Sequence, residues 1–182
     1  SGFVYGDKKI LCPAWRNVGK TNLLLQFMTE GSKYIGDDWC ILDKNKNIKI
    51  APKRVNLLDY NLLAFPDITK NIDEKIVSLL EIYKGYKRGE YQFGHKDVEE
   101  LKNNLKVRIS PENLFGKKRL AKNILGLDYV FYLSRNVQNK KMGVYIEKMP
   151  LNELINKIVK IISFEQTPFR LAYNLFKART GE

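Results

Sequence analysis

The stretch that decides the fold is Ala14-Trp15-Arg16-Asn17-Val18-Gly19-Lys20-Thr21. An apolar run over 8–12 precedes it and predicts a buried strand, and an apolar segment over 22–30 follows and predicts a helix that ends at Gly31. A tight turn between a strand and a helix exposes backbone N–H groups, which bind phosphate together with the helix N-terminus. The usual pattern is G-x-x-x-x-G-K-[ST]. The stretch fits it, with Ala14 as a small residue in place of the first glycine.

Each residue of this predicted P-loop has an expected role. The backbone N–H groups of residues 16–20 (Arg16, Asn17, Val18, Gly19 and Lys20) are expected to surround the β-phosphate. The Lys20 ammonium is expected to reach the β- and γ-phosphates, and the Thr21 hydroxyl to bind Mg²⁺. The alternative is a Gly-Lys-Thr sequence that merely starts and caps a helix.

Two adjacent carboxylates, Asp37 and Asp38, come at the end of the next predicted strand, which begins near Lys33 and continues to Leu42. In an open α/β sheet this edge faces the ligand crevice. Carboxylates beside phosphates repel them unless a cation lies between, and Mg²⁺ prefers such oxygen ligands. Neighbouring strand residues point to opposite faces, so one aspartate is expected to bind metal and the other to accept a proton from an attacking hydroxyl. The alternative is an ordinary strand-to-turn break.

The rest of the chain completes an α/β fold with a mixed β-sheet and flanking helices. A polar turn over 43–47 predicts a hairpin, the apolar run 127–133 a central strand, and 143–148 a further strand. Helices are predicted over 67–86, 96–105, from Pro111, and over 151–164 and 168–179. The length predicts one domain over 1–182. The start at Ser1 rather than Met is consistent with missing native N-terminal residues.

Composition narrows the functional classes. The net charge of +12 attracts polyanions, but no nucleic-acid-binding motif accompanies it, so nucleic acid is not expected as a partner. Two cysteines and one histidine are too few for a structural zinc site. Buried free thiols at Cys12 and Cys40 indicate a reducing compartment, which predicts a cytoplasmic protein. The lack of an apolar run of about 20 residues predicts no membrane partner.

The P-loop, the apolar helix and the segment from Glu30 to Leu42 together resemble the core of HPr kinase/phosphorylase and its phosphoenolpyruvate carboxykinase-like relatives. The matching positions after the helix are Gly31, Asp37 and Asp38. The resemblance covers residues 8–50. The chain departs from the family pattern at Ala14, lacks the upstream His-Gly, and has no later Leu-Glu-x-Arg-Gly signature. These departures are typical of a divergent member that acts on another acceptor.

The resemblance implies a kinase that uses ATP and Mg²⁺ to phosphorylate a hydroxyl of a peptide, protein or small molecule. It implies that Lys20 binds phosphate, Thr21 and Asp38 bind metal, and Asp37 is the general base. A homo-oligomer would fit the resemblance. Arg135, at the end of the predicted central strand, is a candidate for stabilising the charge of the transferred group. Two alternatives remain open: a nucleotide-binding regulatory module with little catalysis, and a basic polyanion-binding domain.

Overall fold

The computed structural model describes residues 1–50, 53–122, 125–135 and 143–180. The chain forms two compact units. We name the first, Ser1–Cys12 with Gly19–Phe131, the core unit, and the second, Pro13–Val18 with Tyr132–Glu182, the tail unit. The single domain expected over 1–182 stays a prediction, because the compactness of each unit does not show whether the two units fold together.

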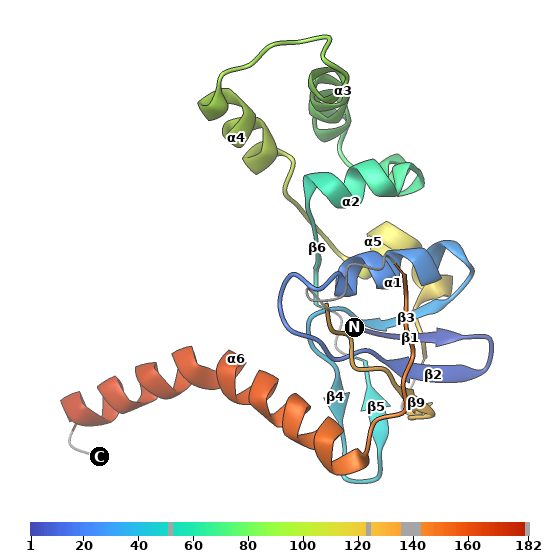
Figure 1. Ribbon diagram of the computed structural model, residues 1–182, viewed down its shortest axis with the longest axis vertical. Helices are drawn as coiled ribbons and strands as arrows, with labels where there is room; N and C mark the ends of the chain where they lie inside the picture. The colour runs from blue at the N-terminus through green and yellow to red at the C-terminus, as the bar shows by residue number, and fades with distance from the viewer. Residues whose placement is uncertain (51–52, 123–124, 136–142, 181–182) are drawn as a thin grey trace. The chain divides into compact units, whose positions relative to one another are not determined.

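The core unit is built on a four-stranded mixed sheet (Figure 1). Its strands run in the order β3 (Lys33–Gly36), β1 (Gly2–Tyr5), β2 (Lys8–Leu11) and β9 (Tyr129–Val130). β1 is antiparallel to both of its neighbours, and β2 and β9 are parallel. The prediction of an α/β fold with a mixed sheet is confirmed. The central strand expected over 127–133 is shorter than predicted, and as β9 it lies at the edge of this sheet rather than at its centre.

Helix α1 (Lys20–Thr29) packs on this sheet through its apolar side chains. The Phe27 ring stacks on Phe3 of β1 with ring centroids 4.4 Å apart. Leu24, Leu25 and Met28 are buried. Residues with these side chains form good helices and also supply the apolar surface that holds the helix to the sheet. The predicted helix after the P-loop is therefore confirmed.

Two smaller sheets complete the strands of the core unit. One has the order β4 (Ile41–Leu42), β5 (Asn47–Lys49) and β8 (Leu125–Gly126). The other pairs β6 (Val55–Leu57) with β7 (Val107–Ile109). The hairpin between β4 and β5 was predicted and is confirmed, and the Asp43 carboxylate accepts hydrogen bonds from the Asn45 and Asn47 N–H groups in its turn.

The prediction that one strand continues from Lys33 to Leu42 is wrong. β3 ends at Gly36, and Ile41 begins a strand of a different sheet. The chain bends so tightly between them that a Cβ atom at Gly36 would lie 2.6 Å from the Trp39 carbonyl oxygen. A glycine here permits the bend that places Asp37 and Asp38 outside the strand.

Strands β6 and β7 carry a helical segment between them, residues 58–106, which we name the helical arm (Figure 1). It contains α2 (Asp59–Ala64), the 3₁₀ helix η1 (Pro66–Asn71), α3 (Glu74–Arg88) and α4 (His95–Asn104). The Asp73 side chain caps α3 at its start, and Gly89, with a φ of 80°, ends it. After β7, the predicted helix start at Pro111 is confirmed as α5 (Pro111–Phe115), which leads into η2 (Lys117–Arg119).

The Arg119 side chain lies at the C-terminal end of α1. Its Nε donates to the Ser32 carbonyl oxygen at 2.9 Å, and its Nη2 donates to the Met28 carbonyl oxygen. Carbonyl groups at a helix C-terminus lack partners inside the helix, so a basic side chain there satisfies them. Arg119 is therefore a capping residue of α1 rather than a solvated surface residue.

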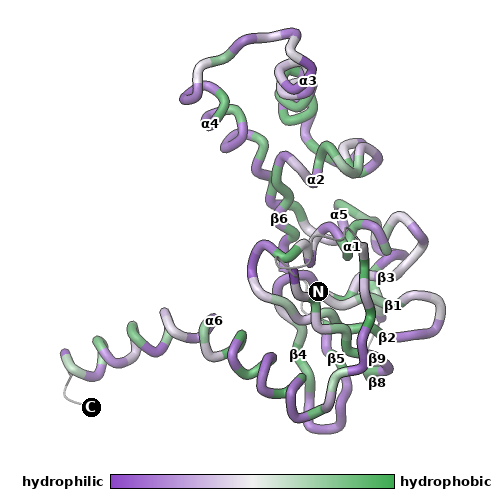
Figure 2. The backbone as a smooth tube through the Cα atoms, in the orientation of Figure 1, coloured by the Kyte–Doolittle hydropathy of each residue, from purple (hydrophilic) through white to green (hydrophobic). Residues whose placement is uncertain are grey.

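The tail unit contains one long helix, α6 (Leu151–Thr180), with Pro168 inside it. The prediction of two separate helices is therefore wrong. The predicted strand over 143–148 is also absent from the structure. Val144 and Ile146 are exposed there, at 92% and 80%, so no neighbouring strand covers them. Along α6 hydrophobic and hydrophilic residues alternate (Figure 2). None of the helices in the described ranges combines the length and apolar composition of a membrane span.

Candidate functional site

The second half of the predicted P-loop lies at the start of α1. Gly19 is the residue before the helix and has a φ of 104°. This conformation is strained for residues with a Cβ atom, so the glycine of the motif is explained by backbone geometry. Lys20 is the first residue of α1, followed directly by Thr21. The start of the helix therefore has the local form that the motif predicts.

The Thr21 hydroxyl meets the Asp37 carboxylate. Thr21 Oγ1 lies 3.1 Å from Asp37 Oδ2 and 3.3 Å from Oδ1, and donates to the carboxylate. The two residues are 16 positions apart, one in α1 and the other just after β3. The bend after Gly36 thus brings together the two motifs that the sequence analysis selected independently.

The Asp37 carboxylate is buried, with 4% of the residue exposed. Burial raises the pKa of Asp37 above the ordinary aspartate value, and the charge of Asp38 raises it further. The positive charge of the Ser1 ammonium, the Thr21 hydrogen bond and the positive charge of Lys20 act in the opposite direction on this pKa. The core unit therefore holds Lys20, Thr21 and Asp37 close enough to interact electrostatically.

Asp38 occupies a different environment from its neighbour. Its side chain is 39% exposed and forms an ion pair with Lys53, with Nζ 3.0 Å from Oδ2. The structure thus separates the two carboxylates by burial and by partner, although both lie beyond the end of β3 and the alternation expected of a strand does not apply to them. Sequence reasoning did not single out Lys53, because it lies 15 residues further on in a segment without a motif.

The first half of the predicted P-loop belongs to the tail unit. Ala14 forms a parallel bridge with Leu133. The Arg16 guanidinium pairs with both carboxylate oxygens of Glu165, at 3.0 and 3.1 Å, and lies over the Phe164 ring. The predicted phosphate ligands here are backbone N–H groups, which this side-chain pairing leaves untested. The partners of Arg16 on α6 were not predicted, since nothing in the sequence links residues so distant.

The backbone of Asn17 has a φ of 61°. Non-glycine residues seldom adopt this left-handed conformation, although asparagine tolerates it better than most. Val18 precedes Gly19, and for both Asn17 and Val18 the role of phosphate ligand stays a prediction. Arg135 also belongs to the tail unit and is exposed, and its role as a charge stabiliser stays a prediction.

The metal and thiol predictions have different outcomes. Clusters of three or more His, Cys, Asp or Glu side chains placed to hold a metal are absent from the described residues. Mg²⁺ in phosphate sites needs only one or two protein carboxylates, so Thr21, Asp37 and Asp38 stay candidates. Cys12 is a buried free thiol, and burial raises its pKa to about 11. Such a thiol is inert at neutral pH, as expected for a core residue.

Helix α1 also contacts the helical arm through a polar pair that the sequence analysis missed. Asn61 of α2 is buried, and its side-chain amide donates to Asn22 Oδ1 at 2.5 Å. Asn61 Oδ1 in turn accepts from the Leu58 N–H at 2.7 Å. The residue after Thr21 is therefore joined directly to the arm.

No protein-family model matches this chain, and no curated protein or solved structure matches it either. The function must therefore be inferred from the residues of the chain itself.

Proposed function

We propose that this protein is an ATP- and Mg²⁺-dependent phosphotransferase, a divergent relative of the HPr-kinase-like enzymes. The observation that carries the proposal is the contact between the Thr21 hydroxyl and the buried Asp37 carboxylate. Helix capping alone can explain a Gly-Lys-Thr sequence at the start of a helix. It does not explain why a buried carboxylate accepts a hydrogen bond from that threonine. The pair supports a cation site beside a phosphate site.

The residues present fit a magnesium ion. Thr21 and Asp37 supply two hard oxygen donors within 3.3 Å of each other. The charge of the buried carboxylate is costly unless cations offset it, and Mg²⁺ would add to the positive charges of Ser1 and Lys20 that act on it. Mg²⁺ bound there would neutralise charge that develops on the transferred phosphoryl group. Lys20, the first residue of α1, would bind the phosphates together with the helix N-terminus.

The geometry favours an allocation of the two aspartates that is the reverse of the one implied by the family resemblance. Asp37 contacts the threonine that is expected to bind metal, so we assign Asp37 to the metal side. Asp38 is accessible from solvent and is therefore better placed to accept a proton from an acceptor hydroxyl. Lys53, which pairs with Asp38, would hold that carboxylate in position.

The first experiment is calorimetry of ATP binding with and without Mg²⁺. We expect metal-dependent binding in the wild type, its loss in Lys20→Ala, and its retention in Lys33→Ala, which removes an exposed lysine of β3. Absence of binding in the wild type, or equal binding by Lys20→Ala, would refute the proposal. Either result would leave Gly19-Lys20-Thr21 as a helix start only.

A second experiment separates the two aspartates. If Asp37 is the metal-side carboxylate, Asp37→Asn weakens the magnesium dependence of ATP binding, whereas Asp38→Asn leaves binding intact and abolishes transfer to peptide or small-molecule hydroxyl acceptors. The opposite pattern would restore Asp37 as the base. Binding that is insensitive to both changes would remove the carboxylates from the site.

A nucleotide-responsive module with little catalysis is the second candidate. The observation that favours it is the Asn22–Asn61 hydrogen bond, which joins the residue after Thr21 to the helical arm. Under this reading Asn22→Ala would uncouple a nucleotide-dependent change of the arm, measured by amide hydrogen exchange over residues 58–106. Phosphoryl transfer to an acceptor hydroxyl would decide for the enzyme.

A further inference from the structure

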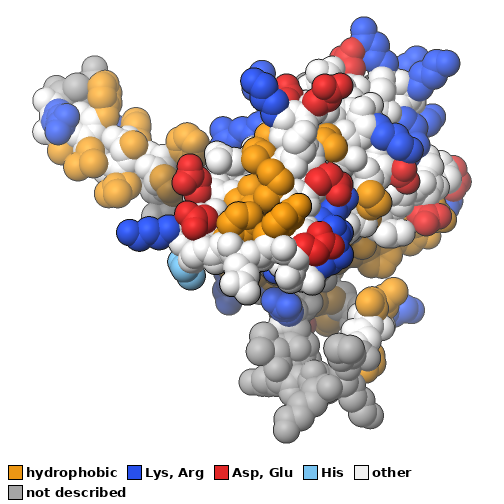
Figure 3. All heavy atoms as spheres, turned by 90° about the horizontal axis from the view of Figure 1, so that it is seen from above, with side chains coloured by type: hydrophobic (Ala, Val, Ile, Leu, Met, Phe, Trp, Pro, Cys, Tyr) orange, Lys and Arg blue, Asp and Glu red, His pale blue; other side chains and the backbone are white. Residues whose placement is uncertain are grey.

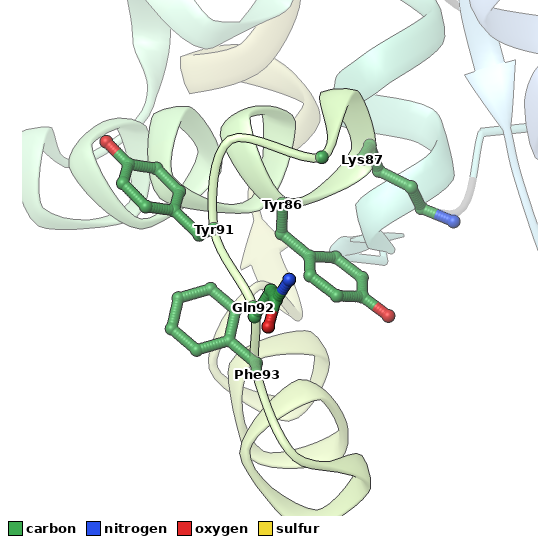
Figure 4. A pocket seen from close by; sticks show the side chains of 6 residues that line it. Tyr86, Lys87, Tyr91, Gln92 and Phe93 are labelled. Atoms are coloured by element: carbon green, nitrogen blue, oxygen red, sulfur yellow. The ribbon is translucent and has the colours of Figure 1, made fainter.

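The turn between α3 and α4 holds an open cavity that the proposed phosphotransfer does not use. Its volume is about 510 Å³, within the range of small-ligand sites. It is lined by Tyr86, Lys87, Gly89, Tyr91, Gln92 and Phe93. Tyr86 and Lys87 come from the end of α3, and the others come from the connection to α4 (Figure 4).

Three aromatic rings form the apolar part of this cavity. The centroids of Tyr86 and Phe93 are 5.8 Å apart and those of Tyr91 and Phe93 are 6.1 Å apart, with tilts of 42° and 38°. Tyr91 is 50% exposed and Phe93 37%. The view from above shows hydrophobic side chains gathered at the surface among charged ones (Figure 3). These rings are in contact with one another, and the faces of Tyr91 and Phe93 that stay accessible offer surfaces on which another planar group can stack.

Gly85 holds one of these rings in place. A Cβ atom at Gly85 would lie 2.4 and 2.7 Å from two carbons of the Tyr91 ring, so only glycine lets the ring lie against α3. This close approach fixes Tyr91 on one side of the cavity. The aromatic wall is therefore built into the backbone of α3 rather than formed by loose surface side chains.

The charge carried by the lining residues of the cavity is positive. Lys87 is its one charged residue, and no carboxylate lines it. Of the neighbouring ions, Arg88 pairs with Glu90 and Lys84 with Glu81, and Asp59 lies beside Tyr83. The Lys87 ammonium lies 5.5 Å from the centroid of the Tyr83 ring. Gln92 lies between Tyr86 and Phe93 and adds an amide that can donate and accept hydrogen bonds (Figure 4).

We propose that this cavity binds a small planar aromatic anion, meaning a ring that carries one phosphate or carboxylate group. The ring packs on the exposed surface of Tyr91 and Phe93, the Gln92 amide forms hydrogen bonds with polar atoms on the edge of the ring, and Lys87 pairs with the anionic group. The single positive charge matches one anionic group rather than a polyanion. Nucleoside monophosphates and aromatic carboxylates share this chemistry, and the experiment distinguishes them.

The test is calorimetry on the full chain carrying Lys20→Ala, in EDTA, so that the proposed phosphotransfer site does not contribute. The probes are adenosine monophosphate, adenosine and 4-hydroxybenzoate. We expect at least one of the two anions to bind more tightly than adenosine. Lys87→Gln should weaken that anion roughly tenfold, as for loss of a charged hydrogen bond, and leave adenosine unchanged.

The ring wall is tested by Tyr91→Leu and Phe93→Leu, each of which should weaken all bound probes about fivefold or more, as for loss of a stacking partner. Tyr60→Leu is the matched control, because Tyr60 is a 48% exposed tyrosine of α2 that does not line the cavity. Binding of a fluorescent single-stranded oligonucleotide in place of the small probes would overturn the proposal. Failure of all probes to bind, or equal losses in the control, would also overturn it. None of these outcomes depends on whether Lys20 binds ATP.

Discussion

Replacement of Thr21 by valine tests the contact on which the proposed function rests. Valine keeps the shape and β-branching of threonine but removes the hydroxyl that donates to Asp37 at 3.1 Å. The buried carboxylate then loses a charged hydrogen bond, which costs about 1.5–3 kcal/mol in the free energy of unfolding. Since the volume is unchanged, we expect no additional cost from a cavity.

The control is Thr29→Val in the same helix. The Thr29 hydroxyl donates to the Gln26 carbonyl oxygen at an exposed position, so its loss removes a neutral bond worth about 0.5–1.5 kcal/mol at most. Urea denaturation followed by far-UV circular dichroism measures both changes. Thr21→Val should lower the free energy of unfolding by about 1 kcal/mol more than the control, when the central values for charged and neutral bonds are compared.

A double-mutant cycle isolates the pair. In an Asp37→Asn background the Thr21 hydroxyl meets a neutral amide, so Thr21→Val should cost only about 0.5–1.5 kcal/mol. The resulting coupling of about 1 kcal/mol exceeds the error of roughly 0.3–0.5 kcal/mol expected for independent sites. A coupling within that error would show that the two side chains do not interact, and the structural basis of the proposed function would be lost.

Three further predictions follow from the core unit. Because burial raises the pKa of Asp37, its ionised form destabilises the fold above that pKa, and this cost disappears as the pH falls through it towards the ordinary value of about 3.9. Asp37→Asn should therefore stabilise the protein at pH 7 but not near pH 4, and an equal effect at both pH values in urea titrations would contradict the assignment. Arg119→Met should lower the free energy of unfolding by about 2 kcal/mol, because the charged donor to the Met28 and Ser32 carbonyl oxygens is lost, whereas Arg108→Met, at the exposed position of β7, should change it by under about 0.5 kcal/mol. Gly85→Ala should displace the Tyr91 ring and shift its NMR resonances, and unchanged resonances would argue against the close packing.

The parts of the fold that depend on local pattern could be predicted from the sequence. Helix α1 follows from an apolar segment after Gly19, the α5 start from Ser110 and Pro111, and the β4–β5 hairpin from a polar turn. The approach of the paired aspartates to the start of α1 was expected from the order strand, helix, strand, although Asp38 rather than Asp37 was expected beside Thr21. In each case the signal lies within a few residues or one supersecondary unit.

Features that depend on tertiary contacts escaped prediction. The end of the strand at Gly36 depends on the Trp39 carbonyl oxygen, which approaches Gly36 closely only in the folded chain. The sequence predicts two helices, the second beginning at Pro168, yet α6 continues through this proline. The capping role of Arg119 joins residues 87 and 91 positions apart, and no local pattern encodes such a distance.

The pairing of β6 with β7 has a consequence for how this chain can change over evolution. Leu57 and Val107 are direct partners in the β6–β7 pair, so the two ends of residues 58–106 are held side by side. A segment whose two ends are already neighbours can be lengthened, exchanged or deleted with little added loop-closure entropy for the rest of the fold. The helical arm is therefore a place where new recognition surfaces can be grafted while the residues around Thr21 stay unchanged. The hydrogen bond between the Asn22 and Asn61 side chains joins it to α1, and a transplanted arm could restore that bond with one asparagine.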